Sequence, residues 1–76
     1  MALFNLTLYK AGECAWKSEP RAFLDEEDAV RAGLEQYERI MDEMPDECLD
    51  WSLELRDFYG DVSRFAWISA DGRVLH

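Results

Sequence analysis

The sequence is poor in the residues that build active sites and metal centres. It contains one histidine, the last residue His76, and two cysteines, Cys14 and Cys48. Chain ends are commonly mobile, so His76 is poorly placed to orient a serine or cysteine nucleophile. Two cysteines without CxxC spacing are too few for a closed zinc site. We therefore predict no catalytic triad and no zinc centre, and we expect both cysteines to be free thiols packed as small buried hydrophobic residues.

Glycine is also scarce, and it is scattered over positions 12, 33, 60 and 72. A phosphate-binding loop needs closely spaced glycines, so the sequence does not support nucleotide binding. The acidic runs Asp25–Asp28 and Asp46–Glu47 lack the alternating ligands and central glycine of a calcium-binding EF-hand loop. A chain of this length also offers little concave surface for a glycosidase-like carboxylate pair. The sequence predicts no metal site, no cofactor and no enzymatic activity.

No apolar run is long enough to cross a bilayer, and Met1–Tyr9 lacks the basic start and small-residue cleavage site of a secretion signal. We therefore expect a cytoplasmic protein without a membrane partner.

The chain does contain enough apolar material for one hydrophobic core. It has 76 residues, of which 49% are hydrophobic and 13% aromatic, a composition too apolar for a disordered chain. Chains of this length do not split into domains, so residues 1–76 are expected to form a single domain. A core built by so few residues is marginal, and dimerisation would be a natural supplement.

Negative charge dominates, and it is concentrated in one segment. Seventeen acids against eight bases give a net charge of −9. Asp25–Asp50 contains eleven acids and two bases, a balance of −9, whereas the rest of the chain holds six acids and six bases. A surface of this sign repels nucleic acid and anionic lipid and attracts basic proteins.

The first part of the chain alternates like a half-buried β-hairpin. Leu3–Tyr9 is predicted to form a strand, because apolar residues alternate with polar ones: Phe4, Leu6 and Leu8. Ala11–Gly12 offers a turn, and Glu13–Lys17 is predicted to return as a second strand. Ser18–Pro20 breaks the pattern, since proline cannot donate to a strand ladder.

A single amphipathic helix follows. Asp25 is a suitable N-cap, and Pro45 is expected to end the helix after about 19 residues. Its apolar stripe comprises Val30, Leu34, Tyr37, Met41 and Met44, flanked by Gly33 and Ile40. Gly33 costs about 1 kcal/mol relative to alanine, which indicates that the helix approaches the sheet closely at this position.

Strand patterns return after the helix. Leu49–Arg56 alternates strictly, Val62–Ile68 is predicted to form another strand, and Asp71–Gly72 predicts a hairpin before Arg73–Leu75. We therefore expect an α+β fold in which one helix covers one face of a small antiparallel sheet of four to five strands, in the order β-β-α-β-β.

A row of acids is the strongest candidate for a binding surface, and we call it the acidic ridge. Its members are Glu35, Glu38, Asp42, Glu43, Asp46, Glu47 and Asp50. Asp42 and Glu43 fall in the last helical turn, where the helix dipole disfavours acids by about 0.3–1 kcal/mol each. Local rules are broken most often at functional sites, so we interpret the acidic ridge as partner-binding. The alternative is an ordinary solvated face, partly neutralised by ion pairs of Arg31 and Arg39 at a spacing of four.

Aromatic residues supply the second candidate. Phe58 and Tyr59 lie beside a predicted turn and are possible binding anchors. The other large aromatics are expected in the core: Tyr9, Trp16, Trp51 and Trp67.

In size, acidity, element order and lack of catalytic residues, the chain resembles the small anti-CRISPR proteins of phages and mobile elements, several of which are similar to DNA in charge layout. It is also similar to a family of small bacterial domains of unknown function in the pieces Tyr9–Gly12 (YKAG), Asp25–Leu34 and Ala70–Val74.

Together with the acidic ridge, the first resemblance implies an inhibitor that acts as a DNA mimic. It would occupy the nucleic-acid-binding surface of a basic partner such as a CRISPR surveillance complex, block target DNA, and bind no nucleic acid itself. The alternative is a structural interaction or homodimerisation module without an inhibitory role. Its exposed sheet edge or apolar face would pair with itself or another chain, and its acids would only keep it soluble.

Overall fold

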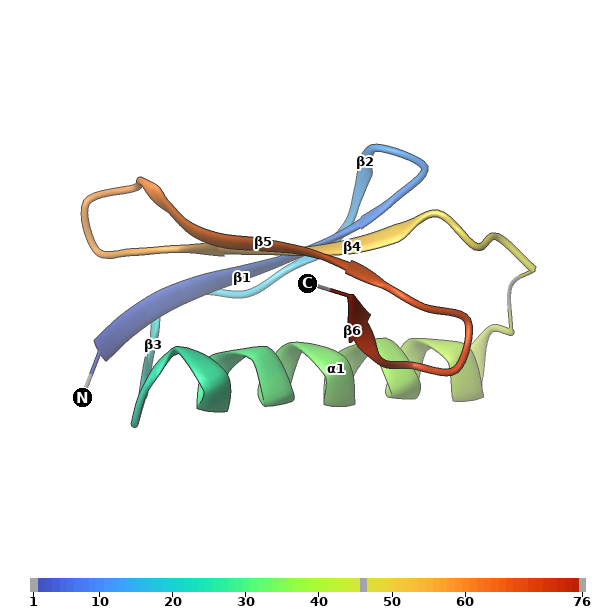
Figure 1. Ribbon diagram of the computed structural model, residues 1–76, viewed down its shortest axis with the longest axis horizontal. Helices are drawn as coiled ribbons and strands as arrows, with labels where there is room; N and C mark the ends of the chain where they lie inside the picture. The colour runs from blue at the N-terminus through green and yellow to red at the C-terminus, as the bar shows by residue number, and fades with distance from the viewer. Residues whose placement is uncertain (1, 46, 76) are drawn as a thin grey trace.

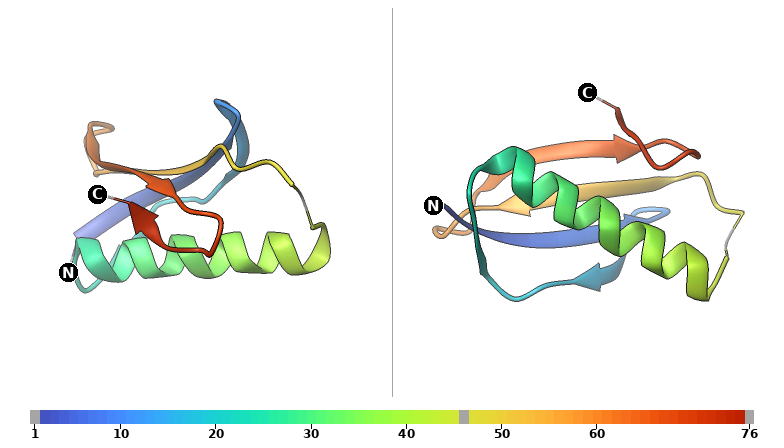
Figure 2. Two further views of the ribbon diagram at one scale, coloured as in Figure 1. Left: turned by 45° about the vertical axis from the view of Figure 1, so that its right-hand side comes forward. Right: turned by 90° about the horizontal axis from the view of Figure 1, so that it is seen from below.

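The protein is an α+β domain with one helix packed on a six-stranded antiparallel sheet, as seen in a computed structural model that describes residues 2–45 and 47–75 (Figure 1). Its elements follow in the order β1 (Ala2–Lys10), β2 (Glu13–Lys17), β3 (Arg21–Phe23), α1 (Glu26–Glu43), β4 (Trp51–Arg56), β5 (Val62–Ile68) and β6 (Val74–Leu75). The helix lies on one face of the sheet only and runs obliquely beneath the strands (Figure 2).

The strands lie in the order β2-β1-β4-β5-β6, and β3 also pairs with β1. The predicted α+β fold, with one helix on one face of an antiparallel sheet, is confirmed, and β6 lies within the predicted hairpin segment Arg73–Leu75. The sheet has six strands rather than four to five, so the predicted order β-β-α-β-β lacks β3 and does not count β6. Strand β3 was missed because Pro20 precedes it and because it is only three residues long. Two hydrogen bonds of Ser18 hold the segment between β2 and β3 against β1. The Ser18 backbone N–H donates to the Leu6 carbonyl at 2.8 Å, and its hydroxyl accepts from the Leu6 N–H at 3.0 Å.

The predicted helix is confirmed, with small shifts at its ends. The Asp25 carboxylate accepts a 2.8 Å hydrogen bond from the Asp28 N–H, as expected of an N-cap. The helix ends at Glu43 with Met44 as its C-cap, one residue before Pro45. Met44 is 74% exposed, so it does not continue the buried stripe that Val30 and Tyr37 begin.

The hydrophobic core lies between the helix and the sheet face that it covers. Alternate residues of β1 and β4 point into it, and the largest fully buried side chains are Leu6, Leu8, Leu53 and Leu55. The predicted strand Leu49–Arg56 begins two residues later than expected, and Leu49 is 74% exposed. Cys14 and Cys48 do not form a disulfide bond, as predicted, but Cys14 is exposed and Cys48 is only partly buried.

Gly33 sets how closely the helix approaches the sheet. A Cβ atom at this position would lie 2.7 Å from Cδ2 and 2.8 Å from Cδ1 of Leu53. Leu53 is 1% exposed and has little room to move aside. The close approach predicted from Gly33 is confirmed, because any side chain at this position would push α1 away from β4.

We predict that Gly33→Ala destabilises the protein, because overpacking costs about 1–3 kcal/mol while alanine returns only about 1 kcal/mol of helix propensity. Leu53→Ala alone should cost about 2–5 kcal/mol. In the double variant the added methyl group on α1 fills the space that the Leu53 side chain leaves, so the loss should be smaller than the sum by about 1–2 kcal/mol. Chemical denaturation of the four proteins measures this coupling.

Phe23→Ala serves as the control, since Phe23 is buried but is not among the residues nearest to a Cβ on Gly33. Combined with Gly33→Ala, it should give additive losses. Additivity between Gly33→Ala and Leu53→Ala would show that this contact does not limit the helix–sheet distance.

Candidate functional site

The acids of the first helical turn have structural roles. The Asp28 carboxylate accepts from the Leu24 N–H at 3.2 Å, and Arg31 lies 3.8 Å from Asp28. Glu26 and Glu27 both pair with Arg64 of β5, at 3.3 and 2.5 Å respectively. These carboxylates therefore fix the start of α1 to the sheet and are not freely offered to a partner.

The acidic ridge differs in this respect. Its described members are exposed, and within residues 2–45 and 47–75 no lysine or arginine forms an ion pair with any of them: Glu35, Glu38, Asp42, Glu43, Glu47 and Asp50. Arg31 pairs with Asp28 instead of Glu35, and the last turn of α1 carries no basic residue. Asp46 lies outside the described residues. The ion pairs expected of an ordinary solvated face are therefore not formed along the described part of the ridge.

The fold divides the acidic ridge among different surfaces. Glu38 and Asp42 line one hollow of about 480 Å³, between the second half of α1 and the β5–β6 turn. Glu35 lies on the side of α1 that faces β3, and Glu43 faces β1 and β2. Asp50 lies on the opposite face of the sheet. The ridge is therefore not a single continuous row, and Glu38 and Asp42 are the two described members that meet at one hollow.

Asp71 joins this pair, and we call the resulting site the acidic hollow. Its lining includes the carboxylates of Glu38, Asp42 and Asp71 and the apolar side chains of Tyr37, Met41 and Leu49. The Asp71–Gly72 hairpin was predicted, and Gly72 has the positive φ of 81° that this turn requires. No local pattern indicates that the turn lies against α1, where Glu38 Oε1 is 3.8 Å from the position of a Cβ on Gly72.

Contacts within the β5–β6 turn favour the negatively charged form of Asp71. The Ser69 hydroxyl donates to the Asp71 carboxylate and lowers its pKa, and Arg73 contributes in the same direction. Arg73 Nε lies 3.5 Å from Asp71 Oδ2, but both side chains are largely exposed, so this pair is weak. The acidic hollow therefore combines carboxylates with apolar side chains, an arrangement suited to a lysine or arginine side chain with its aliphatic stem.

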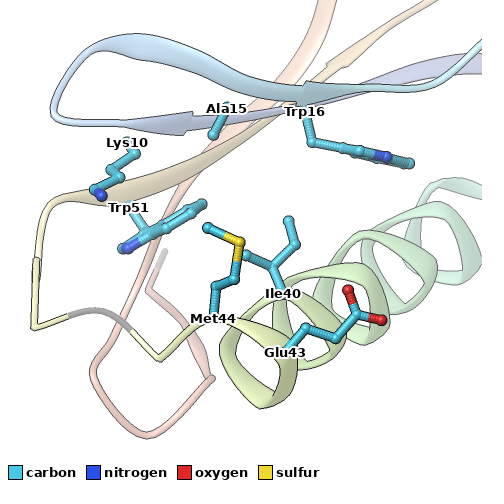
Figure 3. Close-up of a pocket in the computed structure, with 7 residues that line it drawn as sticks. All are labelled: Lys10, Ala15, Trp16, Ile40, Glu43, Met44 and Trp51. Atoms are coloured by element: carbon cyan, nitrogen blue, oxygen red, sulfur yellow. The ribbon is translucent and has the colours of Figure 1, made fainter.

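A second hollow of about 320 Å³ lies between β1, β2 and the end of α1 (Figure 3). Trp16 and Trp51 approach it from the strands, and Ile40, Glu43 and Met44 approach it from the helix side (Figure 3). The indole N–H of Trp51 is buried and has no hydrogen-bond partner among the described residues. Glu43 thus belongs to this tryptophan hollow and is separated from the acidic hollow.

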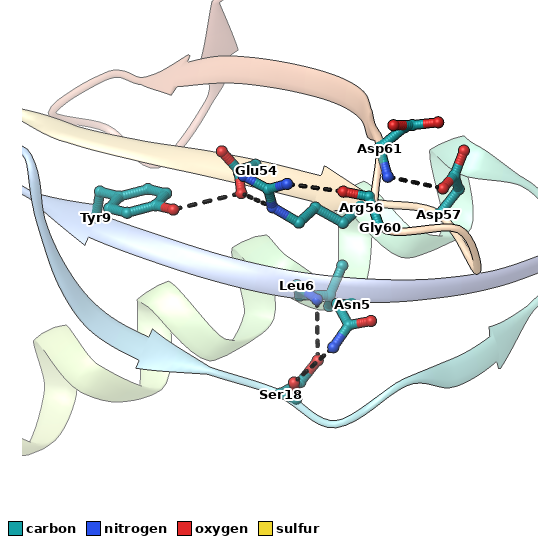
Figure 4. Close-up of polar contacts among 9 residues, drawn as sticks. All are labelled: Asn5, Leu6, Tyr9, Ser18, Glu54, Arg56, Asp57, Gly60 and Asp61. Carbon is teal, nitrogen blue, oxygen red and sulfur yellow. Dashed lines mark hydrogen bonds and ion pairs between the residues drawn. The ribbon is translucent and has the colours of Figure 1, made fainter.

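The sheet face opposite the helix carries a polar network beneath aromatic side chains. The Glu54 side chain is 11% exposed, and its Oε1 accepts from the Tyr9 hydroxyl at 3.3 Å and from Arg56 Nε at 2.7 Å (Figure 4). Phe65 and Trp67 stand beside it, with ring centroids 5.4 Å apart. Trp67 is 51% exposed, so the prediction that it lies in the core is wrong. Its strand β5 places it on the uncovered face, in alternation with the buried Ala66 and Ile68.

The possible anchors Phe58 and Tyr59 are 74% and 86% exposed. They lie in the β4–β5 turn, where the Asp57 carboxylate accepts from the N–H groups of Tyr59 and Asp61 at 2.9 and 3.0 Å. The acidic hollow is at the β5–β6 turn, and the two turns lie at opposite ends of β5. The structure therefore does not bring these aromatics together with the acids.

The Tyr9 network predicts a loss of stability at alkaline pH. Burial, followed by the Glu54 carboxylate, raises the pKa of Tyr9. A raised folded-state pKa means that the folded state holds the proton more tightly, so the free energy of unfolding falls as pH rises above about 10, the pKa of an unfolded tyrosine. Tyr9→Phe should reduce this fall in the free energy of unfolding. Part of the fall should persist in this variant, because burial also raises the pKa of Tyr37. Urea unfolding between about pH 9 and pH 11 measures the fall. An unchanged pH dependence in Tyr9→Phe would contradict the role of this network.

Within the part of the chain that the structure describes, no group of three or more His, Cys, Asp or Glu side chains is placed to hold a metal ion. No described helix combines the length and apolar character needed to cross a membrane. Comparisons with protein-family models, with curated proteins and with solved structures found no match to the chain. The resemblance to anti-CRISPR proteins thus stays a prediction.

Proposed function

We propose that the protein is an acidic, non-catalytic inhibitor that binds the nucleic-acid-binding surface of a basic partner through the acidic hollow. One observation carries this proposal. The carboxylates in the second half of α1 are exposed and without ion-pair partners among the described residues, whereas those of the first turn are held by Arg64 and by the N-cap. Acids at the end of a helix oppose its dipole, so this arrangement costs stability and is better explained by a binding role.

The geometry of the acidic hollow supports a cationic occupant. Glu38 and Asp42 are four residues apart on α1, so their side chains are neighbours about 5–6 Å apart at Cβ. Asp71 adds a third carboxylate from the other side of the hollow. A lysine or arginine of the partner would pack its aliphatic stem against Met41 and Leu49 and bring its charged group to the carboxylates.

The nucleic-acid-binding surface of the partner is proposed because of charge spacing. Proteins that bind DNA or RNA present lysine and arginine side chains that neutralise the phosphates. The exposed acids of α1 offer a comparable series of negative charges about one helical turn apart, with the net charge of −9 supplying attraction at longer range. A CRISPR surveillance complex is one partner of this kind, suggested by the resemblance in size and charge alone.

We predict that the double reversal Glu38→Lys with Asp42→Lys abolishes partner binding. The matched control is Glu13→Lys with Glu19→Lys, two exposed acids of the β2 region away from the acidic hollow. Each reversal adds two charges, so both variants change the net charge from −9 to −5 and differ only in where the negative charge is removed. Pull-down from bacterial lysate at low and high salt, followed by mass spectrometry, compares the three proteins.

Wild type and the control should retain the same nucleic-acid-binding protein or complex. That protein should be released by salt, because exposed charges are screened, and by an added DNA or RNA oligonucleotide that competes for the same surface. Equal retention by the Glu38/Asp42 variant, or retention that the oligonucleotide does not affect, would reject the proposal.

A further inference from the structure

The sheet face opposite the helix, which we call the outer face, leaves large apolar side chains uncovered. Strand alternation and register place on it the exposed residues Leu3 (42%), Phe65 (48%), Trp67 (51%) and Leu75 (54%). Trp67 pairs with Leu75 across β5 and β6, and its ring meets that of Phe65 edge to face. Phe65, Trp67 and Leu75 form a contiguous apolar patch, unlike the single exposed hydrophobic residues that are common on protein surfaces.

The polar residues in the middle of the outer face are buried or hydrogen-bonded. Thr7, Ser52 and Glu54 lie on this face, yet each residue is 8% exposed or less. The Glu54 carboxylate is held by Tyr9 and Arg56 from the same face. The middle of the outer face can therefore be covered by another apolar surface without burying an unpaired charge, which would otherwise be costly. The exposed charges lie toward its ends, because Lys17 belongs to the edge strand β2 and Asp50 precedes β4.

The charge distribution favours a second copy of this chain as the occupant. The ionisable side chains that strand register places on the outer face are Tyr9, Cys14, Lys17, Glu54 and Arg56, with Asp50 near one end. The excess of acids lies instead on α1 and the segment after it. A basic partner would find few carboxylates on this face, and a nucleic acid would find few lysines or arginines. A second copy of this chain fits, because pairing the two outer faces keeps both acidic helices on the outside.

We propose that two copies of the protein pack outer face to outer face, as a sheet-on-sheet dimer with Trp67 and Phe65 at its centre. Packed sheets lie about 10 Å apart with their side chains interdigitated, which suits a face that presents aromatic rings above small buried residues. The acidic hollows stay exposed on both copies, so the dimer would present two of them. This interface does not depend on what the acidic hollow binds.

Sedimentation velocity over a concentration series tests the dimer. Wild type should pass from monomer to dimer as concentration rises, and Trp67→Ser and Phe65→Ser should each weaken the dimer at least about tenfold, as loss of a central aromatic does at protein interfaces. Phe58→Ser is the matched control, because Phe58 is 74% exposed but lies in the β4–β5 turn. It should leave the dimer unchanged. Circular dichroism of each variant separates loss of the dimer from loss of the fold.

Salt dependence distinguishes this interface from the acidic hollow. Two copies that each carry −9 repel one another, so raising NaCl from about 50 mM to about 500 mM should strengthen the dimer, whereas it should weaken binding of a basic partner. The Glu38/Asp42 reversal should leave the dimer intact. A wild type that stays monomeric at high protein and salt concentration, or a dimer that Trp67→Ser and Phe65→Ser do not affect, would overturn the proposal.

Discussion

The contact between Gly33 and Leu53 is the constraint on which the arrangement of this protein depends. It brings α1 so close to β4 that a Cβ on Gly33 would meet the Leu53 side chain at 2.7 Å. The helix thereby shields the leucines of β1 and β4 from water, and their burial supplies much of the driving force for folding. The helix can reach this distance only at a glycine, so the weakest helix former in its interior is also the residue that allows the core to form.

A single helix held this closely covers only one face of a six-stranded sheet, and both proposed surfaces follow from that. Beyond the core, the second half of α1 meets the β5–β6 turn, which brings Asp71 to Glu38 and Asp42. On the other side, no described element covers the outer face, and Phe65 and Trp67 remain about half exposed. The charged surface and the apolar surface are thus separated by the thickness of the sheet, so an acidic contact and an apolar contact can form independently.

The sequence predicted the features that depend on local pattern. The Asp25 N-cap, the alternation in β1 and β4, and the close approach at Gly33 all follow from neighbours within a few residues. Prediction failed where the position of a residue depends on how distant elements pack together. Pro20 hid the short β3, and alternation in β5 could not show that Trp67 faces away from the helix.

The candidate site was predicted only in part, for the same reason. Asp71 was recognised as a turn residue, but its place beside Glu38 depends on how β5 and α1 pack. Asp50 looked continuous with the acidic ridge, yet the chain between α1 and β4 carries it to the outer face. Helical spacing alone could place Glu38 and Asp42 together, because both belong to one element.

Nuclear magnetic resonance titration with a short lysine- and arginine-rich peptide tests the central claim, that the acidic hollow is the cation-binding surface. The account predicts chemical-shift changes concentrated at Tyr37, Glu38, Met41, Asp42 and Asp71, which line the hollow from α1 and the β5–β6 turn. Backbone amides near Glu13 and Glu19, which are also exposed, should change little. Changes spread evenly over all exposed acids would contradict the account, because the carboxylates of α1 would then act only as part of a diffuse negative surface.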